Sequence, residues 1–131
     1  FMGEKDFQQY LLIKKILGKK FKIEIVGCPI VRDKNKIALS TRNKLLNKDS
    51  VKKASNIARK LISLKRNSTI NKVKMPINFF KIKSDFEKQY KIKIDYLEIR
   101  DEKNLKLNNF KSKYRLFIAY NINNVRLIDN F

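Results

Sequence analysis

The chain has 131 residues, 43% of them hydrophobic, which suffices for one domain, or for part of one plus a small second domain. Its longest unbroken apolar run, residues 116–120, is far shorter than the roughly 20 residues that span a bilayer, so no membrane-spanning segment is predicted. With no histidine and one cysteine, the sequence excludes an internal disulfide and the usual zinc sites, and a reducing, cytoplasmic setting fits.

The net charge is +20, from 32 Lys and Arg against 12 Asp and Glu. Such a field attracts nucleic acid, acidic membranes or phosphorylated ligands. The lysines are interleaved with Asn and Ile along the whole length, and no basic and aromatic nucleic-acid module is recognisable. We therefore expect no specific nucleic-acid partner and no membrane partner, while a basic nucleic-acid-binding module and a structural interaction domain stay open as alternative functions.

The first 27 residues predict a strand, a helix and a second strand. Residues 1–2 resemble the end of a buried strand, and residues 7–17 have helical spacing with Gly18 as the natural stop. The alternation in residues 22–27 predicts the second strand, so the unit is βαβ with parallel pairing. The residues expected to face the sheet from the helix are Phe7, Leu11, Ile13, Ile16 and Leu17.

Two helices are predicted next. The first covers residues 51–65 and could be capped by Asn47, Asp49 or Ser50. A polar connector, residues 66–74, leads to Pro76 at the first turn of a helix over residues 77–90. Phe80 and Phe86 of that helix are expected to point inward.

Three strands follow, at residues 94–100, 114–122 and 125–128. Asn123 and Asn124 between the last two predict a hairpin turn, because Asn tolerates positive φ. The second part of the chain is therefore expected to place two helices against a small antiparallel sheet.

One segment suited to phosphate begins at Gly27 and ends in Ser40, Thr41 and Arg42. Hydroxyls donate hydrogen bonds to phosphate oxygens, and a guanidinium spreads positive charge over them. From spacing alone, the favoured interpretation is instead that Ser40 or Thr41 caps a helix and that Arg42 is solvated.

A second such segment is Gly3–Gln9. Lys5, Asp6 and Gln9 fall on one face of a helix's first turn, at the carboxyl end of a strand where anions and ligands bind. The alternative is a capping box of Asp6 and Gln9 that serves only stability.

These blocks, in this order and followed by Arg126-Leu127-Ile128-Asp129-Asn130, resemble the pantothenate synthetase (pantoate–β-alanine ligase) family. The resemblance spans the whole chain but only the C-terminal half of those enzymes. It implies an α/β fold: a βαβ remnant of a Rossmann-like nucleotide-binding domain at 1–44, then a small α+β lid domain at 45–131.

The resemblance also implies the site residues. Lys5 and Arg42 would be catalytic, offsetting phosphate charge, and Gln9 would contact pantoate. The family usually has Asp-Gly-Leu where this chain has Asn35-Lys36-Ile37, and two serines where it has Ser40-Thr41. No residue of this half is implied as a metal ligand. The residues implied in ATP binding are Gly3, Glu4, Lys5, Asp6, Val31, Leu39, Ser40, Thr41 and Arg42.

The implied reaction is the condensation of pantoate with β-alanine, which uses ATP and Mg²⁺ and passes through pantoyl adenylate. The family's other half, with its Gly-rich nucleotide turn, a pair of His residues and most of a homodimer interface, has no counterpart here. We therefore expect the chain alone to be inactive, and we expect it to be part of a longer polypeptide.

The remaining candidates are interpreted as structural. Glu24, Glu98 and Asp101 have no spacing that joins them as an acid–base pair, and Cys28 resembles a small buried core residue. We expect Arg126 and Asp129 to hold the last strand to its neighbours. Residues 33–42 have little apolar content to anchor them, so the sequence predicts a mobile loop.

Overall fold

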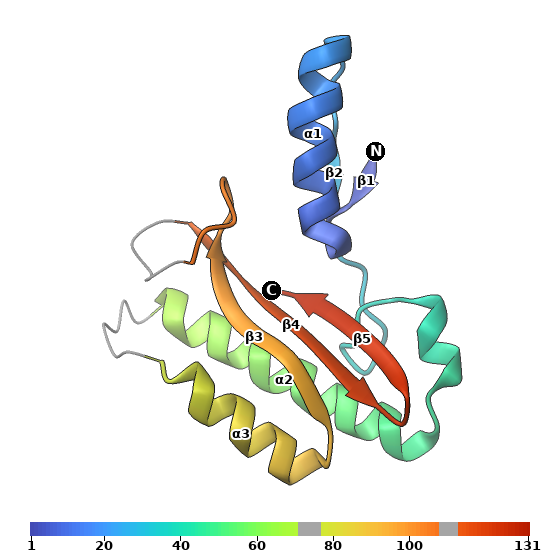
Figure 1. The fold of residues 1–131 in the computed structure, drawn as a ribbon. Helices are drawn as coiled ribbons and strands as arrows, with labels where there is room; N and C mark the ends of the chain where they lie inside the picture. Colours follow the sequence, from blue (N-terminus) through green and yellow to red (C-terminus); the bar gives the residue numbers. More distant parts are fainter. Residues whose placement is uncertain (71–76, 108–112) are drawn as a thin grey trace.

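The computed structural model describes residues 1–70, 77–107 and 113–131 (Figure 1). Among these residues, none of the helices combines the length and the apolar character that crossing a bilayer requires. The helices and strands in chain order are β1 (Met2–Gly3), the 3-10 turn η1 (Glu4–Asp6), α1 (Phe7–Phe21), β2 (Gly27–Cys28), the 3-10 helix η2 (Thr41–Leu45), α2 (Lys48–Ile70), α3 (Phe79–Tyr90), β3 (Lys93–Asp101), β4 (Tyr114–Ile122) and β5 (Val125–Asn130).

The described strands form two sheets. β1 and β2 are parallel, with Met2 opposite Gly27 and Gly3 opposite Cys28, which confirms the predicted βαβ unit. β3, β4 and β5 form an antiparallel sheet with β4 in the centre. The mixed α/β fold predicted from the sequence is therefore confirmed, whereas its division into domains at residue 44 stays a prediction.

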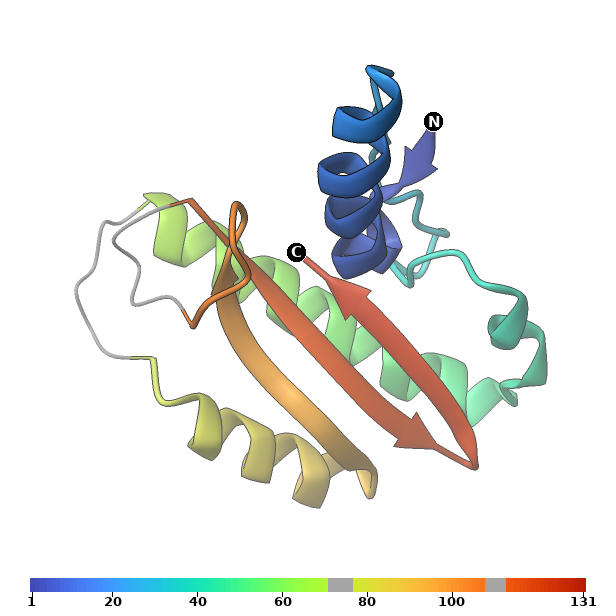
Figure 2. The ribbon, with the colours of Figure 1, turned by 45° about the horizontal axis from the view of Figure 1, so that its top comes forward.

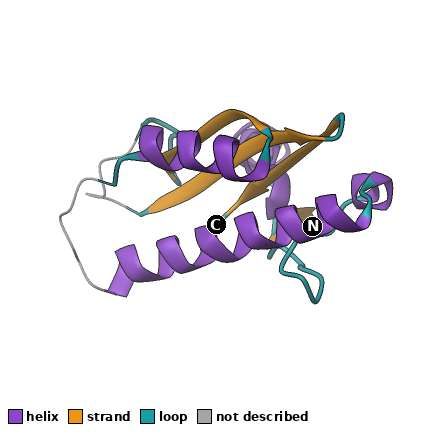
Figure 3. Ribbon diagram, turned by 90° about the horizontal axis from the view of Figure 1, so that it is seen from below, coloured by secondary structure: helices purple, strands orange, loops and turns teal. Residues whose placement is uncertain are grey.

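One face of the antiparallel sheet packs on α2 and α3, as Figure 3 shows from below. Alternate residues of β4 point to this face because successive side chains of a strand alternate. They meet apolar residues of both helices in one core. Its members include Ala54, Ile57 and Leu61 of α2, Phe86 and Tyr90 of α3, and Leu116, Ile118, Tyr120 and Ile122 of β4.

The opposite face of the sheet meets the beginning of α1. Phe117 of β4 is 3% exposed, and its ring centroid lies 6.1 Å from that of Phe7. Tyr10, one turn along α1, belongs to the same small cluster. The rest of α1 extends away from the antiparallel sheet in both views (Figures 1 and 2).

The β4–β5 hairpin forms as predicted. Ile122 pairs with Val125, and the two residues between them, Asn123 and Asn124, have φ of 47° and 63°. Two consecutive positive φ values define a turn whose twist matches that of the flanking strands. The last strand continues two residues beyond its predicted end, to Asn130.

Helix α1 does not stop at Gly18 as predicted, but continues to Phe21 and ends with Lys22 at φ 52°. The glycine has a different role: a Cβ at Gly18 would lie 3.3 Å from the carbonyl oxygen of Ile23, where the chain returns beside the helix. Ile16 and Leu17, expected to face a sheet, are 53% and 37% exposed.

The predicted bounds of the second strand, residues 22–27, are also wrong. Among the described residues, β2 pairs only at Gly27 and Cys28, opposite Met2 and Gly3. Before that ladder, the Met2 amide donates to the Val26 carbonyl at 2.9 Å. Cys28 is half-buried rather than buried.

Of the three cap candidates for α2, the structure favours Asn47, whose Oδ1 accepts from the Ser50 amide at 2.8 Å. The helix runs on to Ile70, so the first part of the predicted connector is helical. Residues 71–74 of that connector, and Pro76, lie outside the described residues.

Helix α3 begins at Phe79, two residues later than predicted, with Asn78 as its cap. Its inward positions are consequently Phe79, Ile82 and Phe86. Phe80 falls between them and is 82% exposed, so its predicted inward position is wrong.

The fold predicts a sharp contrast between two leucines. Leu61, fully buried in the α2–sheet core, should cost about 2–5 kcal/mol of unfolding free energy when changed to Ala, because the cavity cannot collapse completely. Leu45→Ala, at a side chain 70% exposed, should change it by less than about 0.5 kcal/mol. Denaturant unfolding of the two variants measures the difference, and equal losses would contradict this core.

The side chain of Lys65, near the end of α2, extends to Tyr114 at the start of β4. Its ammonium donates to the Tyr114 carbonyl and lies 3.6 Å from the centroid of the Tyr114 ring. Burial lowers the pKa of Lys65 to about 8, against the opposing attraction of Glu102. The native protein therefore holds fewer protons than the unfolded chain between about pH 8 and the ordinary lysine value of 10.5.

Raising the pH through this window should stabilise the wild type relative to Lys65→Met, which lacks the group. The measurement is the difference in melting temperature between the two proteins at pH 7.5 and at pH 9.5. Lys52→Met, at an exposed lysine of the same helix, controls for the loss of one charge. A difference between wild type and Lys65→Met that is constant with pH would contradict the buried position of this amine.

Candidate nucleotide site

The candidate segment Gly3–Gln9 begins with a turn, Gly3–Asp6, that connects β1 to α1. Its residues 4–6 form η1, and the main chain of this turn is bonded to the last strand. The Asn130 side-chain amide donates to the carbonyls of Glu4 and Lys5, at 2.9 and 2.8 Å. The C-terminus and the base of α1 consequently lie side by side in Figures 1 and 2.

The Glu4 carboxylate is also held from β4. Arg115 Nη2 donates to Glu4 Oε2 at 3.0 Å, and the same guanidinium lies 4.1 Å from the centroid of the Phe7 ring. On its other side, Glu4 Oε1 approaches Gly27 so closely that a Cβ there would be 2.7 Å away. Gly27 is therefore required for space, and the Glu4 side chain is directed toward the protein.

The first turn of α1 presents two polar side chains to solvent. Asp6 is exposed and its side chain makes no capping hydrogen bond, so the capping box proposed as the alternative for Asp6 and Gln9 is not formed. Gln9 is exposed as well. Both side chains can be reached by a ligand.

The other candidate segment, which begins at Gly27 and ends at Arg42, is held in place through Arg32. Its guanidinium makes a two-point contact with the Asp129 carboxylate, at 2.7 and 3.0 Å, and donates to the Lys36 carbonyl at 3.0 Å. Within the turn, Asp33 Oδ1 accepts from the amides of Asn35 and Ile37. The turn 33–36 is thereby tied both to itself and to β5.

After this turn the chain is anchored by apolar residues. Ile37 and Ala38 are 6% and 4% exposed, and Ile37 joins the main core. The expectation that residues 33–42 lack an apolar anchor is therefore wrong. The β-branched Ile37 and the small Ala38 are enough to anchor the loop, because α2 passes close to both.

Residues 39–42 then turn back toward solvent. Leu39 is 54% exposed, Thr41 and Arg42 are exposed, and Ser40 is half-buried. Ser40 Oγ accepts from the Arg42 amide at 3.3 Å at the start of η2, which is the cap expected from spacing alone. This bond uses the oxygen of Ser40 as an acceptor, so its hydroxyl hydrogen is free for a further partner.

The structure brings the two segments to the same end of β5. Lys5 and Asp129 line a small cavity of about 10 Å³, roughly one water molecule, together with Ala38 and Asn43 on either side of residues 39–42. Asn43 donates to the Ala38 carbonyl, while its buried Oδ1 has no protein partner among the described residues. Val31, 64% exposed, accepts from the Leu39 amide through its carbonyl at 2.9 Å.

Sequence reasoning assigned no role to Arg32, Arg115 or Asn130, although Asn130 belongs to the closing motif of the resemblance. The structural role expected for Asp129 is supported by its pairing with Arg32, and Arg126 pairs with Asp95 of β3 at 2.8 Å. Burial raises the pKa of the Asp129 carboxyl, and the Arg32 hydrogen bonds offset only part of that effect. No local pattern around the two arginines marked them among so many basic residues.

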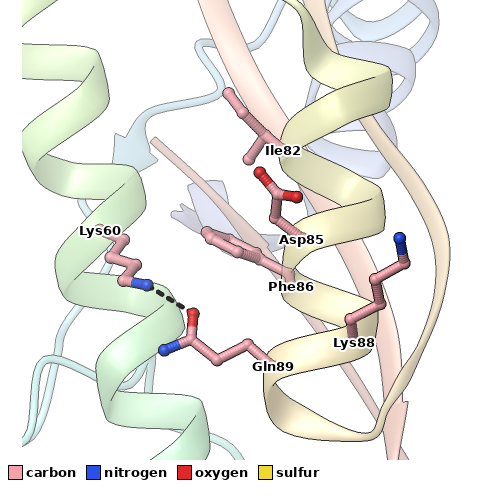
Figure 4. A pocket seen from close by; sticks show the side chains of 6 residues that line it. All are labelled: Lys60, Ile82, Asp85, Phe86, Lys88 and Gln89. Carbon is pink, nitrogen blue, oxygen red and sulfur yellow. Dashed lines mark hydrogen bonds between the residues drawn. The ribbon is translucent and has the colours of Figure 1, made fainter.

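The remaining candidate features of the described residues do not contribute to this site. No group of three or more His, Cys, Asp or Glu there could hold a metal ion, and Glu24, Glu98 and Asp101 form no such site. A shallow pocket of about 610 Å³ lies between α2 and α3, where Lys60 donates to Gln89 at 2.8 Å (Figure 4). None of the predicted site residues lines this pocket.

Comparison with known proteins gives a consistent result. The sequence is 39% identical over 140 residues to the pantothenate synthetase of Flavobacterium psychrophilum, covering 99% of this chain and 47% of that protein. The corresponding values for the pantothenate synthetase of Leptospira interrogans are 38% over 133 residues, 99% and 46%. The chain thus spans about half the length of the curated relatives it matches.

Solved structures agree. Pantothenate synthetase from Thermus thermophilus superimposes with a TM-score of 0.78 at 28% identity, over 98% of this chain and 47% of that one. Pantoate-beta-alanine ligase from Francisella tularensis, solved in complex with beta-gamma ATP and beta-alanine, gives 0.68 at 33% identity, over 99% and 41%. The statistical description of the family named pantoate-beta-alanine ligase matches residues 1–131, and the chain therefore belongs to that family.

Proposed function

We propose that residues 1–131 are the second half of a ligase that uses ATP to join pantoate to β-alanine, releasing AMP. The observation that carries this proposal is the family match, which extends over the whole chain and therefore over both candidate segments. In addition, both segments carry exposed side chains, while hydrogen bonds and buried neighbours hold their main chain in place.

In this proposal the cationic groups Lys5 and Arg42 offset the negative charge of the nucleotide phosphates. Within the described residues, no ion pair engages the exposed Arg42 side chain, which leaves it available for a phosphate. The hydroxyls of Ser40 and Thr41 donate hydrogen bonds to phosphate oxygens. Since the chemistry is a transfer at phosphorus and then at an acyl carbon, the protein contributes mainly positioning and charge compensation.

The remaining ATP contacts follow from the same two segments. Gly3 and Asp6 hold the nucleotide from the β1–α1 turn, and Val31 and Leu39 offer exposed apolar surface to the base. Glu4 differs from these, because its carboxylate is already bonded to Arg115. Its contribution to nucleotide binding is therefore assigned to its main chain.

The described residues contain no carboxylate cluster for Mg²⁺. Mg²⁺ keeps most of its water and is commonly bound through substrate phosphates with one or two carboxylates. We therefore assign the ion to the nucleotide phosphates, where it would neutralise charge alongside Lys5 and Arg42.

The outer face of α1 supports the need for another half of the protein. Leu12 and Ile16, four residues apart on one face of the helix, are more than half exposed, and the small parallel sheet contains two strands of two residues each among the described residues. A helix with such a face is normally covered. Since the relatives are about twice as long, we propose that their first half corresponds to what covers α1.

Residues 1–131 alone should show no β-alanine-dependent AMP release, and adding the first half of a relative such as the Flavobacterium protein should restore it. Ile16→Asp should prevent this recovery, because a charge on the covered face is costly to bury. Phe80→Asp, at an exposed aromatic on α3, is the control and should leave recovery intact. Turnover by the isolated chain would show that the essential groups are assigned wrongly.

Gln9 is tested in a full-length ligase that carries this chain as its second half. Gln9→Glu removes an amide donor and places a negative charge beside anionic substrates, a loss of at least ~1.5–3 kcal/mol. That corresponds to a roughly ten- to hundred-fold fall in pantoate-dependent rate. Gln8→Glu makes the same change at the neighbouring exposed glutamine and should have little effect.

Melting temperature and pantoate kinetics are measured together for the two glutamine variants. Because no capping box is formed, neither substitution should alter melting by more than a few degrees. Normal pantoate kinetics in Gln9→Glu would remove Gln9 from the site.

A further inference from the structure

The two candidate nucleotide segments are bonded to neighbouring residues, Asn130 and Asp129, at the end of β5. Asn130 holds the Gly3–Asp6 turn and Asp129 holds Arg32, although these two partners are more than 20 residues apart in the sequence. The two neighbours at the end of one strand therefore determine how the segments lie relative to each other.

Asn130 is 1% exposed, and both ends of its side-chain amide are engaged. Nδ2 donates to the carbonyls of Glu4 and Lys5, and Oδ1 accepts from Arg115 Nη1 at 3.0 Å. Arg115 in turn holds the Glu4 carboxylate. A carboxylate at position 130 would place oxygen against two carbonyl oxygens, so only a donor fits this position.

Asp129 acts on the other segment through Arg32. The guanidinium is shared between the Asp129 carboxylate, the Asn130 carbonyl and the Lys36 carbonyl. The Lys36 carbonyl belongs to the turn directly before residues 37–42, so a displacement of Arg32 moves that turn. The Arg32 guanidinium also lies 4.5 Å from the centroid of the Phe131 ring, which restricts it from one side.

We propose that Asp129 and Asn130 are positioning residues that set the spacing of the Gly3–Asp6 turn and the Leu39–Arg42 segment for nucleotide binding. This inference rests on the proposed function. The bonds go to main-chain carbonyls and a guanidinium beside the two segments. Asn130, opposite Phe117, lies on the sheet face away from the main apolar core, whereas Asp129, opposite Ile118, lies on the core face near the end of the strand. A perturbation at Asn130 should therefore alter nucleotide use more than it alters folding.

The test uses Asn130→Asp in a full-length ligase that carries this chain as its second half. The variant keeps the side-chain shape but exchanges the donor for an oxygen, which should raise the KM for ATP roughly 10- to 100-fold through misplacement. The KM for β-alanine should be unchanged. Asn121→Asp, the same change on β4 at an asparagine bonded to Asp95, is the matched control and should leave both KM values unchanged.

Asp129→Glu covers the case in which Asn130→Asp does not fold. It keeps the charge opposite Arg32 but lengthens the side chain by one methylene, so the turn 33–36 should shift and the KM for ATP should rise in the same selective way. An unchanged KM for ATP in the folded variants, with only a lowered melting temperature, would show a purely structural role and overturn the inference. If the unmodified ligase released no AMP with β-alanine, the proposed function itself would be rejected, and this inference with it.

Discussion

The fold depends on one constraint, the burial of β4 on both of its faces. Its even-numbered residues pack on α2 and α3, while Phe117 packs on the start of α1. A central strand enclosed in this way ties the parallel βαβ unit to the antiparallel sheet at a single place, the base of α1. Asn130, which holds the Gly3–Asp6 turn, lies on the Phe117 side of the sheet, and its neighbour Asp129, which holds Arg32, lies on the opposite side.

Three of the few acidic residues in this chain form ion pairs near the base of α1. The chain has 12 acidic residues against 32 basic ones, yet Glu4, Glu102 and Asp129 are placed against Arg115 and Arg32. Exposed ion pairs contribute little to stability, but these are half-buried or buried, and each also joins separate parts of the chain. Most of the lysines that the structure describes are exposed, so the high net charge is compatible with a well-defined polar network at the site.

Features governed by local chemistry could be predicted from the sequence, and features governed by distant partners could not. The Asn123–Asn124 hairpin follows from the tolerance of Asn for positive φ, and β4 from a continuous run of strand-forming residues. The role of Gly18 depends on the returning chain at Ile23, and no local pattern in the sequence indicates that contact. The hydrogen bonds of Asn130 could not be predicted, because nothing near it in the sequence indicates its partners, Glu4 and Lys5.

The bond between Asn130 and Glu4 joins residues 126 positions apart, almost the full length of the chain. A ribosome synthesises Gly3–Asp6 near the start of this segment and Asn130 at its end, so the turn can take its final form only when the whole segment has emerged. Chains that stop before β5 would lack Asn130 and would leave the turn without this attachment. Attachment of the Gly3–Asp6 turn therefore has to wait until β5 has been synthesised.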